Sequence, residues 1–175
     1  MSARPRIVVL GAGSIGCHVG LTWLAGGLDV RFIGRPEMAL AMERNGARVE
    51  NGERADTLAP GQIAFSTGPA ALADADIVAL CVKVTDDAAA AAEIAASARP
   101  ETVVLSLQNG VDNGVRLAAM LPGMTIVEGM VPYNVIRPQP AHFRKASAGG
   151  LMAGRNAVLE AALAPMAGTP GAVAR

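Results

Sequence analysis

Six residues near the N-terminus have the spacing of a phosphate-binding loop. The pattern Gly-x-Gly-x-x-Gly follows an apolar run and opens a segment with helical periodicity, which is the context that such a loop requires. The first glycine permits a tight turn, the second lets the backbone approach a pyrophosphate, and the third lets helix and strand pack closely. The alternative is a glycine-rich turn without a ligand. We predict a dinucleotide-binding loop whose N–H groups hold the pyrophosphate, made of Gly11, Ala12, Gly13, Ser14, Ile15 and Gly16.

The residue after the second predicted strand bears on the choice of dinucleotide. Sites for NAD usually have an acidic residue there, about 20 residues beyond the loop, which binds the ribose 2′-hydroxyl. This sequence has Arg35 instead, and a guanidinium suits a 2′-phosphate. Glu37 is close enough to reach a ribose hydroxyl, and an ordinary solvated arginine is the other reading of Arg35. We expect NADPH as the cofactor.

Two further polar side chains follow predicted strands. Lys83 ends the apolar run DIVALCV and is one of only two lysines beside thirteen arginines. Asn109 lies in the segment SLQNG, which ends the next strand. Ligands of doubly wound sheets bind beyond the carboxyl ends of the strands, so both side chains should face one cleft. The alternative for Lys83 is a surface lysine whose stem covers the sheet edge.

The remaining candidates for chemistry are interpreted as structural. His18 and His142 stand alone, and no cluster has the spacing of metal ligands, so no metal site is expected. Cys17 lies near a helix N-terminus, which favours a thiolate, although most free cysteines are small buried residues. The pair Asp86–Asp87 is interpreted as a helix cap.

Short β-rich runs alternate with longer helical ones, as in a parallel sheet covered by helices. After residue 131, short segments separated by Pro and Gly (133–137, 141–145 and 150–154) indicate an antiparallel meander, and a helix capped by Asn156 follows. We predict an α/β fold of Rossmann type, with a doubly wound, mostly parallel sheet, over residues 1–166 and a loose tail over 167–175. The predicted strands are 6–10, 29–33, 48–53, 63–66, 76–82, 102–107 and 125–131, and the predicted helices are 14–25, 36–44, 86–98, 111–121 and 156–166.

Composition narrows the class of protein. Fifteen basic residues balance fifteen acidic ones, which argues against nucleic-acid or membrane partners bound through bulk charge. No apolar run approaches the roughly 20 residues that span a bilayer, and the run 7–10 is too short for a signal peptide. Two cysteines are too few for a disulfide framework. We expect a cytoplasmic protein with a small-molecule partner.

Taken together, these motifs resemble the ketopantoate reductase (2-dehydropantoate 2-reductase) family. The resemblance implies NADPH-dependent reduction of the keto acid ketopantoate to pantoate, a step toward pantothenate and coenzyme A. It also implies that the glycine loop holds the pyrophosphate, that Arg35 binds the 2′-phosphate and that Lys83 contacts the cofactor. Asn109 would lie near the nicotinamide ribose and the substrate, and a backbone group at about Asn134 would touch the cofactor. The matching pieces are IVVLGAGSIGCHVG (7–20), IGR ending at Arg35, DIVALCVK (76–83), SLQNGVDN (106–113) and EGMVPYNV (128–135).

The resemblance also implies that cofactor binding and proton donation are carried by two different domains. Members of that family continue into a helical second domain with a lysine proton donor, which Lys145 does not match. We therefore expect this chain to be the cofactor-binding half, with no assigned catalytic residue and negligible turnover on its own. The alternatives are an NADP(H)-binding module without turnover and a related 2-keto or β-hydroxyacid dehydrogenase. The oligomeric state is left open, with a homodimer as one candidate.

Overall fold

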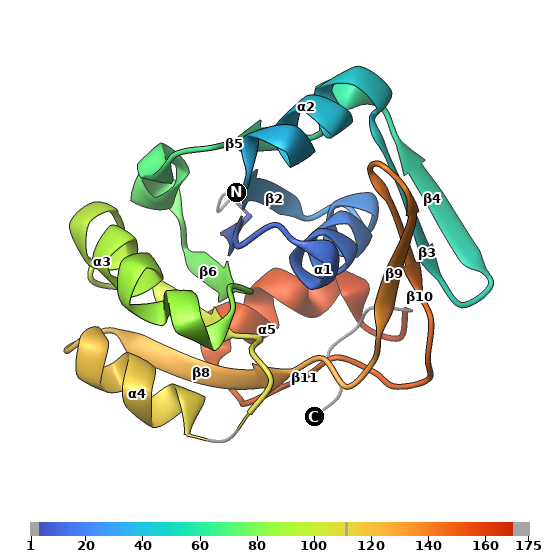
Figure 1. Cartoon of the computed structure of the whole chain (residues 1–175). Coiled ribbons are helices and arrows are strands. Elements are labelled where there is room, and N and C mark those ends of the chain that lie inside the picture. Colours follow the sequence, from blue (N-terminus) through green and yellow to red (C-terminus); the bar gives the residue numbers. More distant parts are fainter. Residues whose placement is uncertain (1–3, 111, 170–175) are drawn as a thin grey trace.

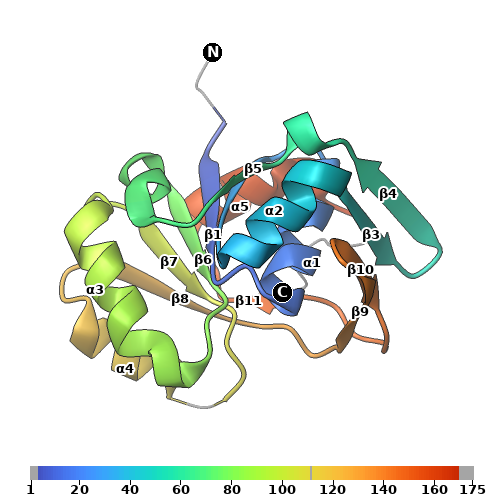
Figure 2. The ribbon, with the colours of Figure 1, turned by 45° about the horizontal axis from the view of Figure 1, so that its top comes forward.

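The computed structural model describes residues 4–110 and 112–169 (Figures 1 and 2). Its centre is a seven-stranded sheet in the order β11-β8-β7-β6-β1-β2-β5, in which only the edge strand β11 runs antiparallel to its neighbour. The other six strands have the order of a doubly wound nucleotide-binding sheet. The predicted α/β fold of Rossmann type is therefore confirmed.

The inner strands are short and apolar because helices cover both faces of the sheet. Every residue of β6 and β7 is buried. The bounds of the strands are β1 (Arg6–Leu10), β2 (Asp29–Ile33), β5 (Ala64–Ser66), β6 (Ile77–Leu80), β7 (Val103–Ser106), β8 (Thr125–Met130) and β11 (Met152–Ala153).

Alternate side chains along each strand feed two separate cores. One core joins the sheet to α1 (Ser14–Ala25) and α5 (Ala157–Leu163), and the other joins it to α3 (Asp87–Ser97) and α4 (Asn113–Met120). Figure 2 shows α3 and α4 on one side of the sheet and α1 on the other. The remaining helices are α2 (Pro36–Asn45) and the short 3₁₀ turns η1 (Pro60–Gln62), η2 (Pro69–Asp74), η3 (Val84–Asp86) and η4 (Ala164–Met166).

A second, four-stranded sheet lies beside α1 in the order β4-β3-β10-β9 (Figure 1). The predicted antiparallel meander is divided between the two sheets. The hairpin of β9 (Val135–Gln139) and β10 (His142–Lys145) pairs in parallel with β3, whereas β11 joins the large sheet. The single strand predicted over 48–53 is wrong, because the chain reverses after Asn51 at Gly52, whose φ is +67°. It forms β3 (Ala47–Asn51) and β4 (Arg54–Leu58) instead.

Both ends of the C-terminal helix region are held by hydrogen bonds. Asn156 caps α5 as predicted, since its Oδ1 accepts from the N–H groups of Val158 (3.0 Å) and Leu159 (3.1 Å). After η4, the N–H of Thr169 donates to the carbonyl of Met166 (3.0 Å). The rest of the predicted tail, 170–175, and the predicted helix start at residue 111 lie outside the described residues. Within residues 4–110 and 112–169, no helix is both long enough and apolar enough to span a membrane.

Candidate functional site

The parallel strands of the large sheet end in register. Leu10 pairs with Ile33 on one side and Leu80 on the other, and Leu80 pairs with Ser106. The loops that follow β1, β2, β6 and β7 therefore start at the same edge. These loops carry the glycine motif, Arg35, Lys83 and Asn109, so register alone brings the predicted residues to one side of the molecule.

Close packing explains two of the three motif glycines. Gly11 has φ of +93°, and a Cβ there would lie 2.6 Å from the N of Val82 and 2.8 Å from the carbonyl carbon of Cys81. A Cβ on Gly16 would lie 2.6 Å from the carbonyl oxygen of Gly11. Gly13 differs, because a Cβ there would meet nothing within 4 Å. The space over Gly13 is open, as a loop that receives a ligand requires.

The first turn of α1 supplies no side chain that would neutralise the helix dipole at its N-terminus. Its N-cap is Gly13, which has no side-chain cap, and its first turn contains no acidic residue. The N–H of Cys17 donates to the carbonyl of Gly13 (2.9 Å). Helix geometry leaves the three preceding N–H groups, those of Ser14, Ile15 and Gly16, without a partner inside the helix. Such groups favour an anion.

Arg35 lies next to the glycine loop and is exposed. A Cβ on the preceding Gly34 would lie 2.9 Å from the Cβ of Ala12, so the backbone between β2 and α2 passes close to the loop. The carbonyl of Arg35 accepts from the N–H groups of Met38 (3.0 Å) and Ala39 (3.2 Å). In the part of the chain that the structure describes, its guanidinium has no ion pair or hydrogen bond.

Lys83 and Asn109 line the same cavity of about 250 Å³. Ile15 from the first turn of α1 and Val131 from the end of β8 also line this cavity. The structure thus places an exposed ammonium and an exposed amide beside the glycine motif. We call this space the smaller cavity.

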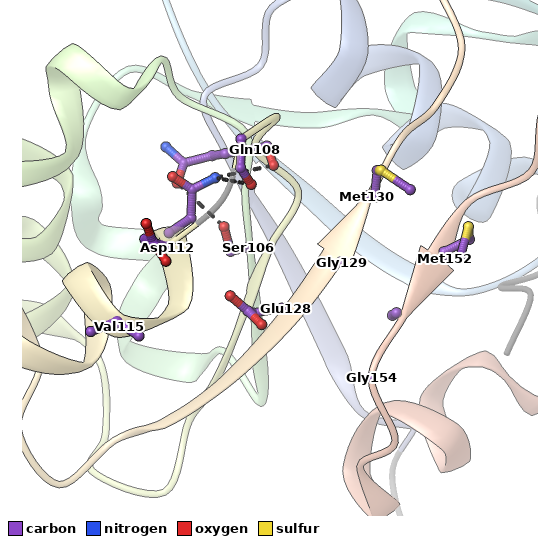
Figure 3. Close-up of a pocket in the computed structure, with 12 residues that line it drawn as sticks. Ser106, Gln108, Asp112, Val115, Glu128, Gly129, Met130, Met152 and Gly154 are labelled. Carbon is purple, nitrogen blue, oxygen red and sulfur yellow. Dashed lines mark hydrogen bonds between the residues drawn. The ribbon is translucent and has the colours of Figure 1, made fainter.

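A larger cavity of about 530 Å³ lies between the start of α4 and the strands β8 and β11 (Figure 3). Met130 and Met152, which pair across β8 and β11, form an apolar part of its wall. Asp112 and Glu128 give it an acidic part, and Glu128 accepts a hydrogen bond from the N–H of Gly114 (3.1 Å) at the start of α4. Gln108 lines both cavities, which therefore adjoin.

Asp87 takes part in a buried hydrogen-bond cluster that the sequence did not predict. The prediction that Asp86 and Asp87 cap a helix is wrong, because the N-cap Asp86 makes no side-chain cap bond and Asp87 turns inward. The carboxylate of Asp87 is buried and accepts hydrogen bonds from Gln108 Nε2 and Arg116 Nη2. Gln108 stands in the SLQNG motif, which was the available signal, but its partners come from two other segments of the chain.

Asn134 and Lys145 lie outside both cavities. The N–H of Asn134 donates to Ser147 Oγ (2.9 Å) and its carbonyl accepts from the N–H of Ala146 (2.8 Å). A cofactor contact at Asn134 therefore stays a prediction and would need the second lone pair of that carbonyl. Lys145 donates to the carbonyl of Gly149 and lies 4.6 Å from the centre of the Tyr133 ring.

Burial governs the titratable groups beneath the glycine loop. It raises the pKa of the Cys17 thiol, and Cys17 Sγ donates to the carbonyl of Ala12 (3.2 Å). Burial also raises the pKa of Cys81 to about 12. His18 is fully buried between the carbonyl of Glu50 (3.0 Å from Nε2) and the hydroxyl of Tyr133 (3.4 Å from Nδ1), and burial lowers its pKa. None of the described residues forms a group of three potential metal ligands.

Comparison with known proteins shows the family to which this chain belongs. A family model described as Ketopantoate reductase PanE/ApbA matches residues 7–157. The 2-dehydropantoate 2-reductase of Halobacterium salinarum is 34% identical over 151 residues, which are 86% of this chain and 49% of that protein. A PanE/ApbA family ketopantoate reductase from Ralstonia eutropha JMP134 has a TM-score of 0.81 and 32% identity, over 94% of this chain and 55% of that one.

A more distant neighbour shares the fold alone. The ternary structure of D-mandelate dehydrogenase with NADH and anilino(oxo)acetate has a TM-score of 0.77 at 19% identity, over 97% of this chain and 56% of that one. The chain spans about half the length of each of these relatives.

Proposed function

Because the chain belongs to the ketopantoate reductase family, we propose that it is the part of a 2-keto acid reductase that binds NADPH. The observation that carries the proposal is the meeting of four groups at one sheet edge. These groups are the open glycine loop, the N-terminus of α1 with no acidic residue in its first turn, the free guanidinium of Arg35 and the cavity between Lys83 and Asn109. The nicotinamide cofactor, when bound, supplies the hydride.

The described residues fit such a dinucleotide along its whole length. The N–H groups of Ser14, Ile15 and Gly16 would hold the pyrophosphate, and the open space over Gly13 leaves room for it. Arg35 would pair with the 2′-phosphate at the adenosine end, for which its planar fork is suited. Lys83 and Asn109 would face the nicotinamide end, where Ile15 and Val131 would give the cavity an apolar part of its wall.

Arg35 is the residue from which we infer a preference for NADPH over NADH. The fold alone does not select NADPH, since the D-mandelate dehydrogenase with this fold is seen with NADH. The choice therefore rests on local chemistry at the end of β2. There the chain has an exposed guanidinium, while Glu37 lies exposed in the first turn of α2.

The two cavities suggest how a keto acid would be oriented. The ammonium of Lys83 and the amide of Asn109 would stabilise negative charge that develops on the substrate oxygen. The larger cavity is unsuited to the carboxylate of the substrate, because Asp112 and Glu128 line it. We therefore place the substrate oxygen near the smaller cavity and assign the carboxylate partners and the proton donor to groups outside the described residues.

A matched pair of glycine variants tests cofactor binding. Gly13 and Gly68 are both N-cap residues with extended backbone, and a Cβ at either would meet nothing within 4 Å. Gly13→Ala should leave stability unchanged but weaken NADPH binding by on the order of tenfold or more, because the methyl group occupies the approach of the pyrophosphate. Gly68→Ala should change neither. Calorimetric titration of NADPH measures the effect, and equal affinities for the two variants would refute the site.

Turnover separates the reductase from a module that binds NADP(H) without reacting. The 175 residues alone should bind NADPH but reduce ketopantoate slowly. Loss of a general acid costs about 10²–10⁴-fold, and an unoriented substrate adds a further loss. The measurement is NADPH oxidation with ketopantoate, beside a full-length relative. Turnover within about tenfold of that relative would show that this chain supplies its own proton donor, and complete absence of turnover would favour the binding module.

A further inference from the structure

A buried polar cluster lies beneath the smaller cavity. The side-chain amide of Gln108 donates to the carbonyl of Val82 (3.0 Å) and to Asp87 Oδ1, and its Oε1 accepts from Ser106 Oγ (3.3 Å). Arg116 Nη2 donates to Asp87 Oδ2. We refer to Gln108, Asp87 and Arg116 as the Gln108 cluster.

The cluster joins the two loops that form opposite walls of the cavity. Val82 directly precedes Lys83 on the loop after β6, and Gln108 directly precedes Asn109 on the loop after β7. The β6–β7 ladder continues as far as the bond from the Leu107 N–H to the Leu80 carbonyl (2.9 Å), and beyond it the side-chain amide of Gln108 links the two loops. Asn113 adds support, since its Nδ2 donates to the carbonyls of Gln108 (3.4 Å) and Gly110 (3.2 Å).

Packing alone does not require a charged residue at the position of Asp87. Asp87 is only 2% exposed, and a buried carboxylate is costly unless it is paired. Apolar residues of similar volume often give equal stability in such places, so a buried pair is weak evidence for stability. The bonds that Asp87 makes instead fix directions, because Gln108 and Arg116 each donate to a different oxygen.

We propose that Gln108 and Asp87 are positioning residues that hold Lys83 and Asn109 at the separation that the nicotinamide end of the dinucleotide requires. Arg116 neutralises Asp87. The inference rests on the proposed function, because it assigns Lys83 and Asn109 to the nicotinamide end. It goes beyond that function by naming residues whose role is to position the cofactor contacts Lys83 and Asn109.

Two probes divide the site into its halves. NADPH spans the whole site, whereas 2′,5′-ADP has the groups that Arg35 and the loop would bind but lacks the nicotinamide. Asp87→Asn removes the charge with little change of shape, and Gln108→Met removes both donors. Each variant should bind NADPH on the order of tenfold more weakly, while the affinity for 2′,5′-ADP stays unchanged. A loss of packing alone would weaken both ligands together.

Asp76→Asn is the matched control. Asp76 directly precedes β6 at its amino end, and its carboxylate accepts from the N–H of Arg6 (2.7 Å) and from Arg99 Nη2 (2.7 Å). This change should lower the unfolding temperature without altering either affinity. Arg116→Lys, at the half-exposed end of the cluster, keeps the charge but loses the planar fork. It tests the proposal with a smaller loss in the same direction should the buried variants unfold.

The outcomes are distinct. Unchanged NADPH affinity in the cluster variants, or equal losses for NADPH and 2′,5′-ADP, would overturn the positioning role while leaving the proposed function intact. Wild-type chain that binds 2′,5′-ADP no more weakly than NADPH would also overturn it, because the nicotinamide end would then make no contact. Wild-type chain that binds neither ligand would overturn the proposed function and this inference with it.

Discussion

The polar groups at the two ends of the parallel strands differ in their partners. We call these two ends of the large sheet its amino edge and its carboxyl edge. At the amino edge, two arginines, one at the start of β1 and one in the loop before β7, are paired within the protein. Arg6 contacts Asp29 (3.0 Å) and Asp74 (3.4 Å), and Arg99 contacts Asp76 (2.7 Å). At the carboxyl edge, the corresponding positions hold the glycine loop, Lys83 and Asn109, which face open space or a cavity.

The difference shows which edge of the sheet has polar groups available to bind a ligand. Both edges lie on the same strands and share the same apolar cores, so packing does not distinguish them. What differs is whether backbone N–H groups and cations find partners inside the molecule. The arginine pairs at the amino edge serve stability. The carboxyl edge has a paired group of its own, the Gln108 cluster, but the first turn of α1 leaves N–H groups there without a partner inside the helix, and to this edge we assign the ligand.

Gly11→Ala should have the largest effect. The new methyl group would clash with the backbone at Val82 and Cys81, and the residue would keep φ of +93°. We expect a loss of about 2–4 kcal/mol in the free energy of unfolding. Gly123→Ala is the control, since Gly123 has φ of +87° but open space around it. Urea denaturation measures both, and equal losses would show that only the φ angle matters.

Arg35→Ala should abolish the preference for NADPH. A charge-assisted bidentate contact contributes about 1.5–3 kcal/mol, so NADPH affinity should fall roughly ten- to hundredfold while NADH affinity stays unchanged. The control is Arg44→Ala. Arg44 is an exposed arginine in the last turn of α2, the helix whose N-cap is Arg35. Calorimetric titrations with both cofactors check this. Retained preference in the Arg35 variant would remove Arg35 from the site.

Arg6→Met makes the corresponding change at the amino edge. Its ion pairs are partly exposed, with side-chain exposures of 27% for Arg6 and 36% for Asp29, so we expect a loss of only about 0.5–1 kcal/mol in stability. NADPH affinity should not change. A weakened NADPH complex, measured under the conditions used for Arg35→Ala, would contradict the separation of the two edges.

The smallest effect is a pH dependence that comes from His18. Burial lowers the pKa of His18 in the folded chain, so near pH 6 the unfolded chain binds more protons than the folded one. His18 therefore contributes stability that is present above its ordinary pKa of 6.5 and is lost as the pH falls below it. Unfolding free energies at pH 8 and pH 5 should differ more in wild type than in His18→Gln. An equal difference would assign the pH dependence to other groups.

Elements with a strong local signal were predictable from sequence. The bounds of β1, α1 and β2 agree with the prediction because a buried apolar strand, a glycine turn and a Gly-Gly stop each act within a few residues. β4 (Arg54–Leu58) was missed because three of its five residues are polar and only Leu58 is buried, so no apolar run marks it. Its position depends on pairing with β3 and contact with α1.

The residues of the candidate site were also predictable only where a local sequence pattern marks them. Arg35, Lys83 and Asn109 were identified because each lies two or three residues beyond the end of a strand, and the register of the parallel strands brings those ends to one edge. The Gln108 cluster was not foreseen, because it joins residues from three segments that no local pattern connects. Asp87 in particular had the position of a helix cap, and only the fold shows that its carboxylate turns inward.

The pairing of β3 with β10 has a consequence for synthesis of the chain on the ribosome. Arg48 of β3 pairs with His142 of β10, so one edge of β3 stays unpaired until the C-terminal part of the chain has emerged. The hairpin of β3 and β4 can form early, because its residues are neighbours in sequence. Until β10 is available, the free edge of β3 can pair with strands of other chains. Nascent or truncated chains that end before β10 should therefore be the forms that depend most on chaperones.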